Sequence, residues 1–301
     1  MANFIIIAIA IVSGILLRKY KSLPQDSHRV VNLWIVNIAL PAIALKYIPK
    51  MQWNWDVMLI ILTPVIIFIG ALLLIIIASK FREIPLKSKA AILLTVGFSN
   101  MSFLGYPITE AYYGEKGLQL AILCDQASFI VVSSLGILTA TYASQGKGKL
   151  DIKKLLYKIF TFPPTIAFIL AFTLPYFVNM SATEPILESL GATMVPMALF
   201  SIGLQLEFKN WQTDKQLLNL AIFYKLLIAP LLVLAFSWFF IIEKLYVQVS
   251  VIEAAMAPMV VGTIIATEFG LNPKLSNNIL SFGIPLSLGT TFLWYLVLNF
   301  M

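Results

Sequence analysis

Long runs of apolar residues alternate with short polar segments along the whole chain. A run of about 20 apolar residues is long enough for a helix that crosses the hydrocarbon core of a bilayer. The pattern therefore predicts an all-α integral membrane protein with ten transmembrane helices. The predicted spans cover residues 3–17, 29–48, 55–79, 90–112, 117–143, 159–178, 185–206, 217–241, 246–267 and 275–300.

The composition agrees with a bilayer environment. The 301 residues are 60% hydrophobic and 12% charged, whereas about a quarter of the residues in a soluble protein are charged. The net charge of +7 is concentrated in the short connections after the first, third and fifth spans. Basic connections stay on the cytoplasmic side. We therefore expect no nucleic-acid partner, a basic cytoplasmic linker at 146–158, and both termini on the non-cytoplasmic side of the cell (inner) membrane.

Two features recur at nearly the same spacing. Pro41 in "NIALPAIALKYI" is followed 155 residues later by Pro196 in "GATMVPMALFSIGLQL", and Gly114 is followed 156 residues later by Gly270. Five spans per half is an odd number, so the two halves would be inverted relative to each other, as in many secondary transporters. The chain is accordingly divided into a first five-helix repeat (1–145), the linker and a second, inverted repeat (159–301).

The segment "GFSNMSFLGYPI" (97–108) places poor helix formers inside an apolar span. Pro107 lacks the N–H that a helix uses, and Gly105 favours non-helical backbone. The matching segment of the second half, "EAAMAPMVVGT" (253–263), contains Pro258. Irregular backbone within a membrane requires a covering of protein or water. We therefore predict two broken helices that cross near the midplane, with half-helix N-termini that favour an anion such as a carboxylate.

Four ionisable residues fall inside the predicted spans, where charge is costly and indicates function by default. Asp125 and Glu253 are expected either to hold a coupling ion or to serve a structural role as paired or cavity-lining acids. Lys46 and Lys225 are expected to extend toward the membrane interface. The single cysteine, Cys124, excludes an internal disulfide.

Several of these segments resemble one known family. "SNMSFLGYPITEAYYG" is similar to the helix-4 signature of the auxin efflux carrier family, and "ALPAIALKYI", "VPMALFSIGLQL" and "AAMAPMVVGTIIATEFG" resemble its segments in helices 2, 7 and 9. The chain lacks the long cytoplasmic loop of the plant PIN exporters, so it resembles a compact microbial member. The resemblance implies a fold related to the bile acid/sodium symporters. Helices 1, 2, 6 and 7 would form a scaffold, through which family members dimerise, and helices 3–5 and 8–10 would form a moving transport domain.

The resemblance also implies an elevator-type transporter of a small organic anion. The implied substrate-binding residues are Asn100, Ser102, Phe103, Gly105, Pro107, Pro258, Val261 and Thr263. The implied ion-coupling residues are Glu253, Asp125, Ser99 and Asn100, with Na⁺ or H⁺ as the coupling ion and a sodium site at Glu253. Neither an organic cofactor nor catalytic residues are expected.

Two other classes of function were considered. A membrane-embedded enzyme is disfavoured because the chain has one histidine and one cysteine and lacks the H-E-x-x-H and G-x-S-x-G motifs. A receptor or sensor that binds an organic acid without transporting it stays open as the alternative to a transporter.

Overall fold

Most of the described part of the chain is helical. The computed structural model describes residues 2–20, 23–24, 26–144, 153, 156–157, 160–178, 180–205 and 214–301. Within these residues no β-strand forms. Six segments of this part are long and apolar enough to cross a membrane: Ser27–Lys50, Val57–Phe81, Met101–Ala143, Ala182–Gln205, Lys215–Ser237 and Pro273–Phe300. Nearly all of the predicted linker 146–158 lies outside the described residues.

The helices follow one another with short connections. The first half contains α1 (Ala2–Lys19), α2 (Ser27–Trp34), η1 (Ile35–Ala39), α3 (Leu40–Tyr47), η2 (Ile48–Lys50), α4 (Val57–Phe81), α5 (Leu86–Val96), η3 (Met101–Gly105), α6 (Tyr106–Val131), η4 (Val132–Gly136) and α7 (Ile137–Ala143). The second half contains α9 (Pro163–Thr173), η5 (Leu174–Tyr176), α10 (Met180–Gly191), α11 (Met194–Gln205), α12 (Lys215–Phe223), η6 (Tyr224–Ile228), α13 (Ala229–Ser237), α14 (Lys244–Ala255), α15 (Val260–Glu268) and α16 (Pro273–Phe300).

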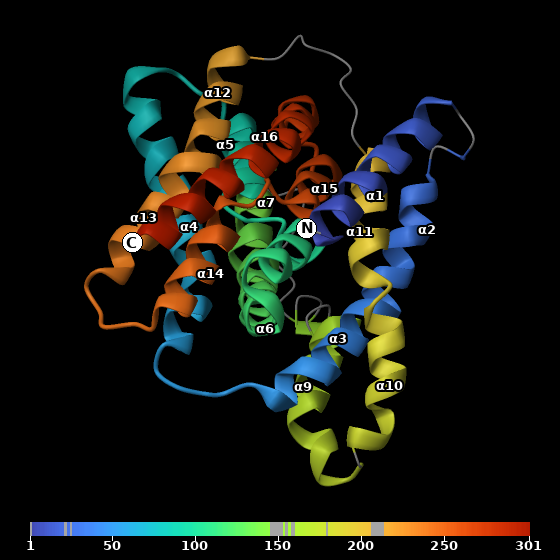
Figure 1. Cartoon of the computed structure of the whole chain (residues 1–301). Helices are drawn as coiled ribbons and strands as arrows, with labels where there is room; N and C mark the ends of the chain where they lie inside the picture. The colour runs from blue at the N-terminus through green and yellow to red at the C-terminus, as the bar shows by residue number, and fades with distance from the viewer. Residues whose placement is uncertain are drawn as a thin grey trace.

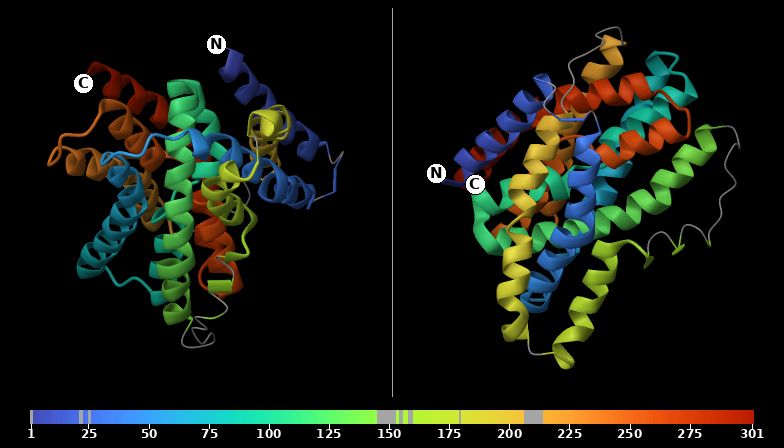
Figure 2. Two further views of the ribbon diagram at one scale, coloured as in Figure 1. Left: turned by 90° about the horizontal axis from the view of Figure 1, so that it is seen from below. Right: turned by 90° about the vertical axis from the view of Figure 1, so that its right-hand side faces the viewer.

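The helices form two groups (Figure 1). In the first group α1 and α2 pack on α11, and α3 packs on α9 and α10. The second group contains α4 to α7 and α12 to α16, in which α14 contacts α4, α6, α13 and α16. The groups meet where α6 contacts α1 and α9, and where η3 contacts α11. The left view of Figure 2 shows the green helices α6 and α7 between the blue and yellow helices of one group and the orange and cyan helices of the other.

Three wide helical turns each precede a proline. The π-helical turns η1, η3 and η6 end two residues before Pro41, Pro107 and Pro230. A proline ring clashes with the carbonyl of the residue four positions earlier and removes one hydrogen bond. A turn of π-helix moves the hydrogen bonds to the residue five positions earlier, as from the Tyr106 N–H to the Met101 carbonyl. The prolines thus stay in helical segments that bulge locally, a feature often found at functional sites.

Two helices are interrupted in the middle of apolar sequence. The break between α5 and η3 covers residues 97–100, and the break between α14 and α15 covers residues 256–259. They pair with each other: the Asn100 N–H donates to the Ala257 carbonyl at 2.9 Å, and the Met259 N–H donates to the Thr95 carbonyl at 3.0 Å. Ser99 and Pro258 form an isolated antiparallel bridge there. This pairing satisfies backbone groups that would otherwise cost several kcal/mol in hydrocarbon.

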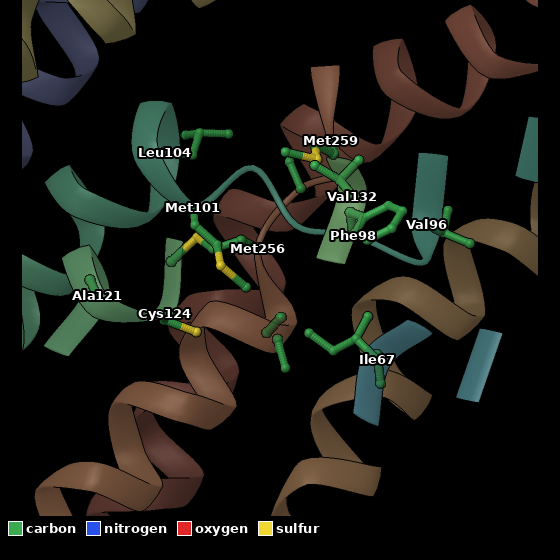
Figure 3. Close-up of a cluster of buried hydrophobic side chains, with 14 of the residues drawn as sticks. Ile67, Val96, Phe98, Met101, Leu104, Ala121, Cys124, Val132, Met256 and Met259 are labelled. Atoms are coloured by element: carbon green, nitrogen blue, oxygen red, sulfur yellow. The ribbon is translucent and has the colours of Figure 1, made fainter. Parts of the chain in front are cut away.

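Apolar side chains enclose the paired breaks. Phe98, Met101, Met256 and Cys124 are buried, and Figure 3 shows them around the point where the two segments of chain pass each other. The breaks therefore lie inside the protein core, away from lipid.

Two glycines adopt the left-handed conformation that other residues avoid. Gly114, at φ 67°, interrupts the helical backbone within α6, and Gly270, at φ 61°, separates α15 from α16. No atom lies within 4 Å of a Cβ built at either glycine, so backbone conformation and not space requires glycine. These two glycines are 156 residues apart in the sequence.

Candidate functional site

Asn100 is the last residue of the first break. Its backbone N–H donates to Ala257, and its carbonyl accepts from the Gly105 N–H at 3.1 Å. The side chain is 4% exposed, and its Nδ2 has no hydrogen-bond partner among the described residues. A buried amide nitrogen without a partner is costly in a folded protein. The first break therefore contains one hydrogen-bond donor that no described residue uses.

Glu253 reaches the same region from the second half of the chain. Its side chain is fully buried, and Oε1 accepts a hydrogen bond of 2.7 Å from Thr109 Oγ1. Oε2 has no hydrogen-bond partner among the described residues. A Cβ built at Gly105 would lie 2.8 Å from Oε1 and 2.9 Å from the carboxyl carbon. The carboxylate of α14 thus packs directly on the backbone that precedes Pro107.

Asp125 lies in the later part of α6, and its carboxylate contacts the beginning of η3, the helical turn that follows the first break. It accepts a 3.1 Å hydrogen bond from the Tyr106 hydroxyl and further bonds from the side chain and the backbone amide of Ser102. The first amides of a helix attract negative charge. The sequence assigns this end of the helix to a substrate anion, but in this structure a carboxylate of the protein itself is bound there.

Lys225 does not extend toward the membrane interface, so that prediction is wrong. The residue is fully buried, and its Nζ donates to Ser99 Oγ and, at 3.0 Å, to the Ala254 carbonyl. The polar atoms of the two breaks hold the ammonium inside the protein. The position of Lys225 within its predicted span indicates whether its side chain can reach the membrane interface. It does not indicate whether a buried acceptor binds the ammonium instead.

A cavity of about 360 Å³ lies beside the breaks, where α6 faces the first group of helices. Tyr106 and Pro107 form part of its wall, together with Lys46, Glu110 and Glu188. Lys46 pairs with Glu188 at 3.5 Å, and its side chain is 10% exposed. Tyr106 therefore lines the cavity and also binds Asp125.

The structure brings together only some of the sequence-predicted site residues. Ser99, Asn100 and Pro258 meet at the paired breaks, Gly105 contacts Glu253, and Ser102 contacts Asp125. Of the predicted substrate-binding residues, Pro107 lines the cavity. Phe103 is half-buried, Thr263 is buried, and Val261 is 40% exposed on α15. None of these last three lines the cavity.

Comparison with known proteins identifies the family. A family model described as "Membrane transport protein" matches residues 1–295. The chain belongs to this family. It is the family of the auxin efflux carriers that the helix-4 motif resembles. Two archaeal relatives are each 26% identical: an uncharacterized transporter of Methanothermobacter thermautotrophicus, matched over 97% of this chain and 96% of its own length, and one of Methanocaldococcus jannaschii, matched over 98% of both.

Membership of the membrane transport protein family makes this chain a multi-pass membrane transporter and not an enzyme. Three side chains that contact the predicted site residues were not predicted as site residues from the sequence: Tyr106, Thr109 and Lys225. Tyr106 and Thr109 lie within or beside the helix-4 motif, and each is a polar side chain inside a predicted span. That signal was available, but the acids they bind are distant in sequence, and one of them, Glu253, lies in the other half of the chain.

Proposed function

We propose that the chain is a secondary active transporter of a small organic anion, with a carboxylate as the recognised group. Family membership supports transport. The observation that carries the proposal of a binding site is the pair of unpartnered buried atoms, Asn100 Nδ2 and Glu253 Oε2, at the two paired breaks. An amide donor suits a substrate carboxylate, and an acid that is not fully hydrogen-bonded suits a coupling ion.

The proposed architecture has ten spans in two inverted repeats, with the broken fourth and ninth spans crossing at the centre. The pairing of residues 97–100 with 256–259 and the matched glycines Gly114 and Gly270 support this interpretation. The first group of helices corresponds to the scaffold of an elevator mechanism, and the second group corresponds to its transport domain. We further propose the cell membrane as the location, both termini on the non-cytoplasmic side, and a homodimer formed through the scaffold.

Counterflow tests the proposed transport. The purified protein would be reconstituted into liposomes loaded with one unlabelled mono-, di- or tricarboxylate, and uptake of the same radiolabelled acid would be followed. Exchange of at least one acid is expected, with empty liposomes as the control. If an acid binds the protein stoichiometrically but none exchanges, a receptor or sensor replaces the transporter.

The coupling ion is proposed to be Na⁺ or H⁺, acting at Glu253 and Asp125. Glu253→Gln keeps the shape of the side chain and its hydrogen bond to Thr109 while removing the negative charge. We expect this variant to lose the dependence of transport on sodium or on pH, whichever the wild type shows. Glu268→Gln, at the exposed end of α15, is the matched control. An unchanged ion dependence in Glu253→Gln would remove Glu253 from the mechanism.

A further inference from the structure

The C-terminal end of α14 is the first part of this inference. The last carbonyls of a helix lack partners within the helix and carry partial negative charge. In membrane carriers with broken helices, such ends commonly coordinate Na⁺. Here the Ala254 carbonyl accepts a hydrogen bond of 3.0 Å from Lys225 Nζ. The position where a metal cation would bind is therefore occupied by an ammonium group of the chain.

The same ammonium also contacts the other break. Lys225 Nζ donates to Ser99 Oγ, and Ser99 forms the antiparallel bridge to Pro258. One charged group thus bonds to an oxygen from each half of the chain. A lysine ammonium has three donors, so it can replace an ion that binds several oxygens at once.

The backbone around Lys225 is anchored on both sides. The hydroxyl of Tyr224 donates to the Ile67 carbonyl in α4. The Leu226 carbonyl accepts a hydrogen bond of 3.0 Å from Trp294 Nε1 in α16. These contacts hold the residues before and after Lys225 in place. The wide turn η6 therefore directs the Lys225 side chain toward the breaks.

A nearby acid partly offsets the cost of burying the ammonium. A buried charge is stable only when it is paired and hydrogen-bonded. Glu253 precedes Ala254 in α14, is fully buried, and attracts Lys225 electrostatically. The helix end and the serine hydroxyl bind the ammonium directly, and Glu253 attracts it without a hydrogen bond. Together they make a place for one cation, and Lys225 fills it.

We propose that the Lys225 ammonium is the permanent cation of the paired breaks and occupies the place of a sodium ion between Ser99 and the end of α14. Neither the stability of the fold nor transport then requires Na⁺ at this position. The inference rests on the proposed function only for its transport readout. Coupling at Glu253 and Asp125 is a separate matter, tested by Glu253→Gln.

The experiment compares cations on wild type and on Lys225→Ala, in which the ammonium and most of its stem are removed. The thermal midpoint Tm of the purified protein and carboxylate counterflow are measured in N-methylglucamine, sodium, potassium and propylammonium chloride at equal ionic strength. Lys244→Ala, at the exposed start of α14, is the control. Wild type and control should respond alike in all four salts.

In N-methylglucamine, Lys225→Ala should have a lower Tm and counterflow reduced by about tenfold or more, because removing one partner of a buried charge leaves the others unpaired. Sodium or propylammonium should restore both in a saturable manner. Wild-type Tm that rises with sodium but not potassium would overturn the proposal. So would Lys225→Ala that matches wild type in N-methylglucamine.

Two further variants cover the case in which Lys225→Ala does not fold in any salt. Lys225→Arg keeps the charge, and Lys225→Met keeps the apolar stem without it. Folding of the arginine variant but not of the methionine variant supports the proposal, and the reverse rejects it. If wild type exchanges no carboxylate in any salt, the proposed function fails, while the Tm measurements still decide the role of Lys225.

Discussion

The carboxylate of Glu253 lies in van der Waals contact with the α-carbon of Gly105, so closely that no side chain fits between them. The contact joins α14 of the second half to the turn η3 of the first half. The fold therefore requires glycine at this position for close approach, in addition to any role of Gly105 in substrate binding. The buried acid and the broken helix are parts of one packed unit.

Gly105→Ala should destabilise the protein. The new methyl group would lie 2.8 Å from Glu253 Oε1, and overpacking of a core costs about 1–3 kcal/mol. Thermal unfolding measures the effect. Gly289→Ala is the control, because no atom lies within 4 Å of a Cβ built there. In a Glu253→Ala background, Gly105→Ala should destabilise the protein less. An equal loss of stability in both backgrounds would show that the contact with Glu253 is not the cause.

Tyr106→Phe should destabilise the protein and weaken substrate binding. The variant removes the hydroxyl that donates to Asp125 at 3.1 Å, and a hydrogen bond to a charged group contributes about 1.5–3 kcal/mol. Because Tyr106 also lines the cavity, loss of its contact with Asp125 changes one wall of the cavity, and an acid that binds there should bind more weakly. Tm and the Kd of an exchanging acid measure the two effects. Tyr142→Phe, at an exposed position on α7, should leave Tm and Kd unchanged. If Tyr106→Phe also has the Tm and Kd of wild type, Tyr106 contributes neither to stability nor to substrate binding through its hydroxyl.

The Arg82–Asp214 pair makes the stability of the fold depend on pH in the acid range. Hydrogen bonds from Arg82 lower the pKa of the Asp214 carboxyl from its ordinary value of 3.8, and backbone amides of Leu217 and Gln216 contribute. An acid with a lowered pKa stabilises the fold above its ordinary value, and this contribution is lost as pH falls through the folded-state pKa. Both side chains are partly exposed, so the contribution is small.

Asp214→Asn should therefore flatten the fall of Tm with acid below about pH 4, where wild type loses stability. Asparagine can still accept the hydrogen bonds that cap α12, so the change isolates the charge. Tm measured across the acid range compares the variants. Asp26→Asn serves as the control, because Asp26 pairs with Arg29 on a largely exposed surface. Parallel profiles for Asp214→Asn and wild type would contradict the prediction.

The sequence predicted the breaks because their causes are local. Proline lacks an N–H, and Pro258 lies within the second break. The first break lies at 97–100, seven residues before Pro107, and Gly105 has helical backbone. Those two residues marked the right segment, but the prediction that they themselves interrupt the helix was wrong. The predicted spans 90–112 and 246–267 correspond to helices that these breaks divide. That is one reason why fewer long helices are present among the described residues than the spans predicted.

The contacts of the site could not be predicted in the same way. Lys225 binds Ser99 across 126 residues, and Thr109 binds Glu253 across 144 residues. Periodicity and helix propensity describe neighbours along the chain, whereas these pairs depend on how two distant helices pass each other. The expectation that Lys225 extends to the interface failed for this reason. A buried carbonyl and a hydroxyl bind its ammonium inside the protein.

Asn100→Ala should weaken substrate binding with little loss of stability. The side-chain nitrogen has no hydrogen-bond partner among the described residues, so its removal breaks no bond of the fold and relieves a buried polar group. If Nδ2 donates to a substrate carboxylate, the lost bond should raise the Kd by roughly threefold to tenfold or more. Tm and the Kd of an exchanging acid, measured on the same preparation, separate the two effects. Asn219→Ala, at an exposed position on α12, should leave both unchanged. A lower Tm with an unaltered Kd would assign Asn100 to the fold and move the substrate away from the first break.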